Sequence, residues 1–168
     1  MSETDEQILG HLLIQHRLWL AVAESCTGGL VGHRITNIAG SSAYFKGGVI
    51  AYANAVKQAV LGVPGVLIEQ HGAVSPEVAL AMAAGVKRAL QADIGLGITG
   101  IAGPDGGTPA KPVGLAYVAI AAPNLERVER CLAGGERESN KVYFADVAFQ
   151  LALDYLGNSL TETLNLRP

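Results

Sequence analysis

The chain has 168 residues, a length that fits one domain with one substantial core, so we expect residues 1–168 to form a single domain. Hydrophobic residues make up 49% of the sequence and charged residues 16%, and this balance excludes a disordered protein. The net charge is −3 and the sequence has no cluster of lysine and arginine, so we expect no nucleic-acid partner.

Helices and strands alternate in the first part of the sequence. Apolar spacing, capping residues and turns predict, in chain order, a helix capped by Ser2 or Thr4 that runs to about His16, a buried strand at Leu18–Ala23, a helix from Gly29 to about Asn37, a turn at Gly40–Ser42 and a strand at Gly48–Tyr52. A short helix over Ala55–Leu61 follows, with Asn54 as its N-cap.

The second part continues this alternation. The predicted elements are a short helical segment from Pro64 to about Gln70, a helix from Ser75-Pro76-Glu77 to about Gln91, strands at Ile94–Thr99, Val113–Ala121 and Val128–Leu132, and a final helix from Arg137 to about Leu156, with a weakly specified tail after Gly157. The last two strands form a hairpin near Pro123-Asn124. This order predicts an α/β fold, a three-layer α/β/α domain with a mixed sheet.

Cysteine use and the N-terminus point to a reducing compartment. Cys26 and Cys131 lie far apart and form no disulfide framework or zinc motif, so we expect reduced, partly buried thiols. The N-terminus is acidic, unlike a signal peptide, and no apolar run reaches membrane-spanning length. We therefore expect a cytoplasmic protein without membrane contact. Alanine-rich helices such as Val78–Ala89 hint at a homo-oligomer, although a well-buried monomer core explains them nearly as well.

Three small nucleophile-type side chains lie where the first strand turns into the second helix. They are Ser25, Cys26 and Thr27, and Gly28 and Gly29 follow them. In open α/β sheets, ligands bind at such strand ends. We expect the helix that follows to aim free backbone N–H groups at this turn, where they can bind a phosphate or a developing oxyanion.

Ser25 needs a base, and the sequence offers two kinds of candidate. The four histidines, at positions 11, 16, 33 and 71, have no evident orienting acid. Lys57 lies in the first turn of the predicted short helix, where desolvation and the helix dipole both lower the pKa of an ammonium group. Tyr52 could hydrogen-bond both Ser25 and Lys57. Spacing alone, however, favours an exposed lysine on an amphipathic helix.

A glycine-rich loop, Thr99–Gly107, follows the third predicted strand. If this strand is parallel to the first, the loop lies at the same edge of the sheet as Ser25, and its glycines allow a ligand to approach the backbone. The loop lacks the Gly-Lys-Ser/Thr ending of a P-loop. Asp105 is isolated and no His-Glu-x-x-His pattern occurs, so we expect no metal site and no cofactor.

Several ordered segments form one pattern over nearly the whole chain. They are Ala23–Gly29, Ile38–Ser42, Tyr52 with Asn54 and Lys57, Gly72–Ser75, Gly97–Gly107 and Lys111–Gly114. This set resembles the CinA C-terminal domain family, whose characterised members include nicotinamide-nucleotide amidohydrolase, the deamidase of nicotinamide mononucleotide (NMN). Many relatives carry an additional N-terminal nucleotide-processing domain, so the pattern predicts a standalone form.

The resemblance implies hydrolysis of the carboxamide of NMN, which gives nicotinic acid mononucleotide and ammonia without a metal or cofactor. It implies that Ser25 is the nucleophile, Lys57 its base and Tyr52 an assisting group. The substrate-binding positions that it implies are Cys26, Thr27, Gly28, Gly29, Ser42, Thr99, Gly100, Gly103, Asp105 and Arg137.

The sequence departs from the family pattern at the start of the last helix. Relatives often have a Gly-Asp-Arg-like motif and then a second arginine, whereas this chain has Gly135-Glu136-Arg137 and then Lys141. Arg137 is the candidate for the phosphate, and Lys141 keeps only a point charge in place of a guanidinium fork.

Two rival interpretations stay open at this point. A thiolate of Cys26, activated at a helix N-terminus, could be the nucleophile in place of Ser25. Alternatively, the chain could be a non-catalytic binding module, because the family is also associated with competence and damage-inducible loci.

Overall fold

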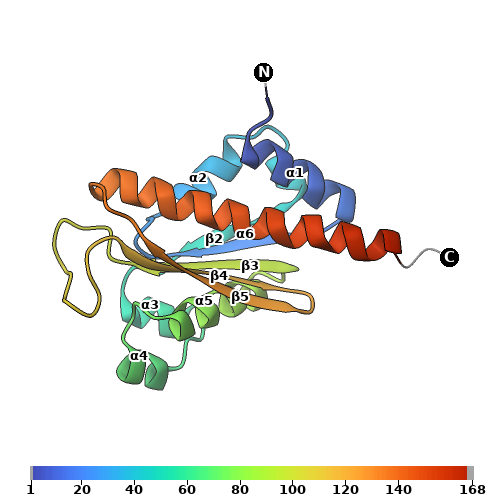
Figure 1. Ribbon diagram of the computed structural model, residues 1–168. Coiled ribbons are helices and arrows are strands. Elements are labelled where there is room, and N and C mark those ends of the chain that lie inside the picture. The colour runs from blue at the N-terminus through green and yellow to red at the C-terminus, as the bar shows by residue number, and fades with distance from the viewer. Residues whose placement is uncertain (1, 166–168) are drawn as a thin grey trace.

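The structure, a computed structural model, describes residues 2–165 and the side chains of residues 2–158. Its elements are α1 (Asp5–His16), β1 (Leu20–Glu24), α2 (Leu30–Thr36), a 3₁₀ turn η1 (Ser41–Ala43), β2 (Phe45–Ile50), α3 (Asn54–Ala59), α4 (Gly65–His71), α5 (Pro76–Ala89), β3 (Ile94–Gly100), β4 (Leu115–Ala122), β5 (Leu125–Leu132) and α6 (Arg137–Asn165). Figure 1 shows α1, α2 and α6 on one face of the sheet and α3, α4 and α5 on the other. The predicted three-layer α/β/α fold is therefore confirmed.

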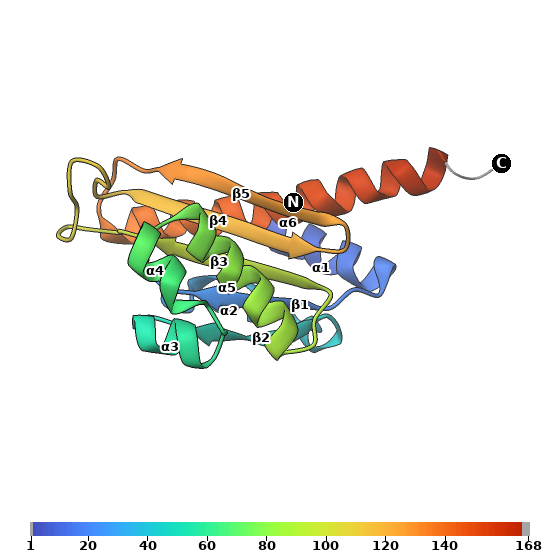
Figure 2. The ribbon, with the colours of Figure 1, turned by 90° about the horizontal axis from the view of Figure 1, so that it is seen from below.

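The five strands form one mixed sheet in the order β2-β1-β3-β4-β5, which is seen from the α5 side in Figure 2. β1 is parallel to both β2 and β3, whereas β3–β4 and β4–β5 are antiparallel. The carboxyl ends of β1, β2 and β3 consequently meet at one edge of the sheet. Within the described part of the chain, no helix combines the length and the apolar character that a membrane crossing requires.

Several local predictions are confirmed by the hydrogen bonds. Thr4 and Gln7 form a capping box at the start of α1, and Ser75 caps α5 ahead of Pro76. The β4–β5 hairpin turns at Pro123-Asn124, where Asn124 has a left-handed φ of 60°. Capping chemistry and turn residues are read from a few neighbouring side chains, which is why the sequence predicts them well.

Other boundaries were predicted wrongly. β2 begins at Phe45 and ends at Ile50, so Tyr52 lies beyond the strand. The adjacent glycines Gly47 and Gly48 weaken the local strand signal, and pairing with β1 holds this segment extended instead. Asn54 is the first residue of α3 rather than its N-cap, and the helix begins without a side-chain cap. The final helix continues to Asn165, into the segment that was expected to be a weakly specified tail.

α5 packs very closely on β3. A Cβ atom at Gly97 would lie 2.4 Å from the Ala79 carbonyl oxygen and 2.6 Å from the Ala83 nitrogen, so only glycine permits this helix–strand distance. Ala79 and Ala83 are fully buried at the contact. The alanine content of α5 therefore serves the core of the monomer, and it gives no separate support to an oligomer.

Replacing Gly97 with alanine should destabilise the protein by about 3 kcal/mol, because the added methyl group overlaps rigid backbone and the layers must separate. Urea unfolding followed by circular dichroism measures the change. Gly134→Ala is the matched control, since a Cβ at Gly134 meets no atom of the described residues within 4 Å. Equal unfolding midpoints for Gly97→Ala and wild type would contradict the packing argument.

Candidate active site

A cavity of about 280 Å³ lies at the carboxyl edge of β1, β2 and β3. Its lining includes Ser25, Cys26, Tyr52, Lys57, Thr99, Gly100, Gly103, Asp105 and Arg137. Ser25 follows β1, Tyr52 and Lys57 follow β2, and Thr99 is the last residue but one of β3. The parallel pairing of the three strands is what gathers these distant segments at one place.

Lys57 is buried against Ser25. Only 1% of Lys57 is exposed, and its Nζ donates to Ser25 Oγ over 3.1 Å, to the Ala51 carbonyl over 2.8 Å and to the Tyr52 carbonyl over 3.2 Å. Burial lowers the pKa of Lys57 from its ordinary value, because the ammonium form loses its hydration. A lysine in its neutral form can take a proton from a serine hydroxyl, so this pair is equipped for nucleophilic chemistry.

The N-terminus of α2 is already occupied by a carboxylate. Glu24, itself only 1% exposed, accepts hydrogen bonds from the N–H groups of Gly29, Val31 and Gly32 at 3.0, 3.2 and 2.9 Å. The expectation of free amides throughout this turn was therefore wrong for Gly29. The Gly28 N–H is also engaged, since it donates to the Ser25 carbonyl.

Two amides of the turn remain for a ligand. Among the described residues, the N–H groups of Cys26 and Thr27 have no carbonyl or carboxylate acceptor. They directly follow Ser25 in the chain, which makes them candidate donors to a ligand bound at its hydroxyl group. The Thr27 hydroxyl is also buried without a hydrogen-bond partner.

The Cys26 thiol is not activated. Burial raises the pKa of Cys26 to about 12, although the nearby N–H groups and Lys57 act in the opposite direction. The expected activation at a helix N-terminus fails chiefly because the thiol is buried, and the Glu24 carboxylate at that end of α2 also raises the pKa of Cys26. The geometry therefore favours Ser25 over Cys26 as the nucleophile.

Tyr52 and Arg137 form a second pair at the mouth of the cavity. Arg137 Nη1 donates to the Gly103 carbonyl over 2.6 Å, and Nη2 donates to the Tyr52 hydroxyl over 3.2 Å. The expected hydrogen bonds from the Tyr52 hydroxyl to Ser25 and Lys57 are not present in the described structure; Tyr52 reaches Lys57 through its backbone carbonyl. Arg137 makes no ion pair among the described carboxylates.

The loop after β3 closes the side of the cavity opposite β2. The Thr99 hydroxyl donates to the Ala73 carbonyl over 2.8 Å, and Gly100, Gly103 and Asp105 lie along the cavity. Asn140 of α6 holds this wall in place: its side-chain amide donates to the Ala102 and Gly135 carbonyls.

Some expected residues lie elsewhere. Ser42 is in η1, which precedes β2, so it lies at the opposite end of the parallel strands from Ser25. None of the four histidines lines the cavity. Lys141 lies one helical turn after Arg137, and its Nζ would be 3.8 Å from a Cβ at Gly28, so it is close to the turn that follows Ser25. The described residues contain no group of three His, Cys, Asp or Glu side chains that could hold a metal ion.

Sequence reasoning missed Glu24 and Asn140. Glu24 had a usable signal, because a carboxylate at the end of a buried strand, just before a glycine-led helix, can accept the first amides of that helix. Asn140 had none for its contact with the cavity wall: two of its three hydrogen bonds join the nearby Gly135, but the third reaches Ala102, whose approach to α6 depends on the whole fold.

Comparison with known proteins places the chain among relatives of one kind. A model of the CinA C-terminal domain family matches residues 2–156. A putative competence-damage inducible protein of Halothermothrix orenii is 53% identical over 149 residues, which are 88% of this chain and 36% of that protein. One from Desulforudis audaxviator is 47% identical over 155 residues, which are 92% of this chain and 38% of the relative. The chain thus spans little more than a third of these relatives.

Solved structures agree in fold. The crystal structure of the competence/damage inducible protein CihA from Agrobacterium tumefaciens matches with a TM-score of 0.84 and 36% identity, over 94% of this chain and 99% of that one. A CinA superfamily protein from Klebsiella pneumoniae matches with a TM-score of 0.86 and 26% identity, over 93% of this chain and 99% of that one.

Proposed function

The chain belongs to the CinA C-terminal domain family, and on this premise we propose that it hydrolyses the carboxamide of NMN to nicotinic acid mononucleotide and ammonia. The observation that carries the proposal is the buried Nζ of Lys57, 3.1 Å from Ser25 Oγ at the wall of the cavity. A buried lysine with a lowered pKa beside a serine is the arrangement that activates a hydroxyl nucleophile.

The first half of the reaction is acyl transfer to the enzyme. Neutral Lys57 takes the Ser25 proton while Oγ attacks the carboxamide carbon. The carbonyl oxygen becomes an oxyanion, and the Cys26 and Thr27 amides donate to it; each well-placed donor contributes about 3 kcal/mol in comparable sites. The intermediate collapses as the C–N bond breaks, and the ammonium of Lys57 returns the proton to the departing ammonia.

The second half regenerates the serine. Lys57, neutral again, takes a proton from water, and the resulting hydroxide attacks the acyl carbon. The ester bond to Ser25 then breaks, and Ser25 Oγ recovers its proton from Lys57. The carbonyls of Ala51 and Tyr52 hold the Lys57 amine in place through both halves.

Cationic side chains at the start of α6 are the proposed phosphate site. Arg137 lines the cavity without a carboxylate partner among the described residues, and Lys141 lies beside the turn that follows Ser25. A guanidinium and an ammonium on consecutive helical turns suit a monophosphate. The hydrogen bond from Arg137 to the Tyr52 hydroxyl fixes the guanidinium above the mouth.

Ammonia release from NMN tests the assignment. Wild-type protein should turn over NMN, and Ser25→Ala should lower kcat by at least about 10³-fold, because the residues of a nucleophile–base pair act as a unit. Ser41→Ala is the matched control, since Ser41 lies in η1 at the far end of β2 and should keep full activity. Full activity in Ser25→Ala would exclude the mechanism. Tight binding of a protein partner with no binding or turnover of NMN would instead support a binding module.

A further inference from the structure

The outer edge of β5 is unpaired, because β5 is the last strand of the sheet within the described residues. An exposed edge strand offers a row of free N–H and C=O groups to another strand. We propose that β5 pairs antiparallel with β5 of a second copy of this chain, around a two-fold axis at Val128, so that the two five-stranded sheets become one continuous sheet.

The backbone direction limits how two such edges can pair. The Ala133 N–H donates to the Gly114 carbonyl on the β4 side. The direction of the backbone N–H and C=O groups alternates along a strand. In odd-numbered residues of β5, as in Ala133, these groups point toward β4, and in Glu126, Val128 and Arg130 they point away from the sheet edge. In an antiparallel pair, a residue whose backbone groups point outward lies opposite another such residue of the partner strand. Val128 can therefore lie opposite Val128 of a second copy.

The charges of β5 are self-complementary in this register. Residues 126–130 read Glu-Arg-Val-Glu-Arg. With Val128 on the axis, Glu126 lies opposite Arg130 of the second copy, and Arg127 lies opposite Glu129. Side chains directly opposite in an antiparallel pair share one face of the sheet, so four Glu–Arg pairs face each other across the axis of the dimer.

The neighbouring registers that the backbone allows are unfavourable. A shift that centres the axis on Glu129 places two glutamates opposite each other, and a shift to Arg127 places two arginines opposite each other. Like charges in directly opposite positions destabilise strand pairing. Within one copy, Glu126 and Arg130 have no ion-pair partner among the described residues, whereas Arg127 already contacts Glu129 and Asp154.

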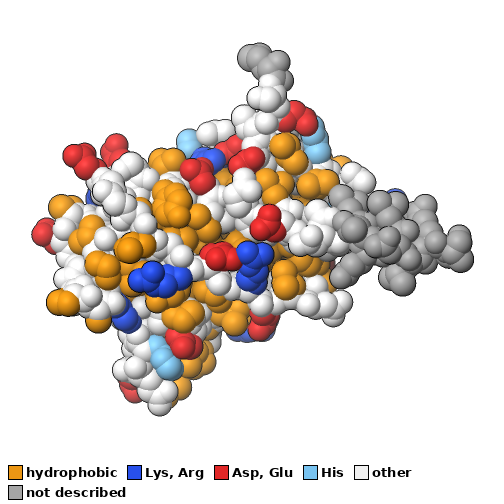
Figure 3. Space-filling model, viewed as in Figure 1, with side chains coloured by type: hydrophobic (Ala, Val, Ile, Leu, Met, Phe, Trp, Pro, Cys, Tyr) orange, Lys and Arg blue, Asp and Glu red, His pale blue; other side chains and the backbone are white. Residues whose placement is uncertain are grey.

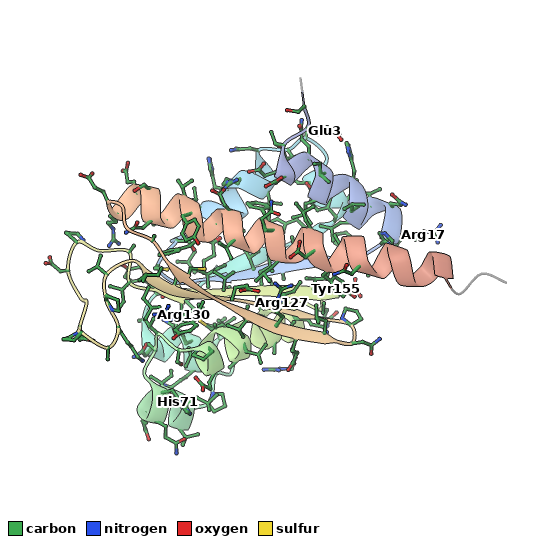
Figure 4. The ribbon with its side chains drawn as sticks, in the orientation of Figure 1. Glu3, Arg17, His71, Arg127, Arg130 and Tyr155 are labelled. Carbon is green, nitrogen blue, oxygen red and sulfur yellow. The ribbon has the colours of Figure 1, made fainter. Side chains whose placement is uncertain are left out.

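Exposed apolar side chains beside β5 provide surface that the proposed dimer could bury. Leu132 and Tyr143 are 54% and 43% exposed, and a groove of about 370 Å³ runs between β5 and α6. Figure 3 shows hydrophobic side chains around the basic and acidic ones on this face, and Figure 4 shows Arg127 and Arg130 projecting from β5. With the two-fold axis perpendicular to the sheet, both α6 helices lie on the same side and their grooves face each other.

Sedimentation velocity over a range of protein concentrations tests the pairing. Wild type should be a dimer that weakens with added salt. Glu126→Arg alone and Arg130→Glu alone place like charges opposite each other, and each should raise the dissociation constant by about tenfold or more. The double variant, Glu126→Arg with Arg130→Glu, restores opposite charges and should dimerise like wild type.

Mixing the two single variants sharpens the test, because Glu126→Arg and Arg130→Glu are complementary to each other and should form a heterodimer. Circular dichroism checks that each variant is folded. A wild type that stays monomeric at all concentrations would overturn the proposal. The charged side chains of β5 would then serve to prevent this edge strand from pairing with other chains. A dimer that none of the reversals weakens would place the interface elsewhere and would equally overturn it.

Discussion

Lys57→Met is expected to abolish NMN hydrolysis while making the fold more stable at neutral pH. The variant keeps the length and volume of the side chain but has no amine to take the Ser25 proton. General-base groups contribute about 10²–10⁴-fold to rates, so kcat should fall by about that factor. The replacement also removes a buried amine whose hydrogen-bond partners, among the described residues, are the Ser25 hydroxyl and two backbone carbonyls.

The stability effect follows from the lowered pKa of Lys57. Burial makes the folded protein release this proton more readily than the unfolded chain does. The unfolded chain therefore binds more protons at pH values between the folded pKa and the ordinary value of 10.5. The free energy of unfolding of wild type should rise with pH through that window. Below the folded pKa, the cost of burying the charged Lys57 ammonium applies in full. Lys57→Met has no such penalty at any pH.

Urea unfolding at several pH values, paired with ammonia release, checks both halves of this prediction. The stability difference between Lys57→Met and wild type should shrink as pH rises toward 10.5. Lys46→Met, which alters an exposed lysine near the other end of β2, should keep wild-type activity and the wild-type pH dependence. An active Lys57→Met variant would show that Lys57 is not the base.

The sequence could predict the parts of the site that depend on strand ends. Ser25 and the glycine-rich loop after β3 were expected at one edge of the sheet, and the parallel pairing of β1 and β3 confirms that placement. This worked because an apolar run, a turn and a helix start are all local features, and the parallel arrangement of α/β strands is a general rule.

The contacts that decide the chemistry could not be predicted in the same way. Local spacing favoured an exposed Lys57, whereas packing of α3 beside β2 buries it and aims it at Ser25. The Tyr52 hydroxyl is directed by Arg137, which is distant in sequence. Contacts of this kind between distant residues depend on tertiary packing, and local patterns in a single sequence do not predict them.

Glu24→Ala should strongly destabilise the turn from Ser25 to Gly29 that joins β1 to α2. The alanine leaves the amides of Gly29, Val31 and Gly32 without an acceptor at a largely buried helix start. Hydrogen bonds to a charged group contribute about 1.5–3 kcal/mol each, although the three losses are not additive. We expect the free energy of unfolding to fall by about 3–5 kcal/mol, measured by urea unfolding.

Glu24→Gln separates a structural role from an effect on the reaction. Glutamine keeps one acceptor oxygen and the side-chain shape, so we expect a loss of only about 1–2 kcal/mol and a folded protein. Because Ser25 directly follows this residue, a small shift of the turn moves Oγ and the Cys26 and Thr27 amides together. kcat should fall by about 10–100-fold with little change in KM, since geometry at the reacting carbon is lost rather than affinity.

Glu77→Ala is the matched control for both Glu24 variants, because Glu77 is also a carboxylate in the first turn of a helix. It is 41% exposed and contacts His71 only at 3.6 Å, so its removal should cost less than about 1 kcal/mol and leave kcat unchanged. If Glu24→Ala unfolds at the same urea concentration as Glu77→Ala, the buried carboxylate does not hold the turn. In that case the position of Ser25 must depend on its own N–H bond to the Ile98 carbonyl of β3.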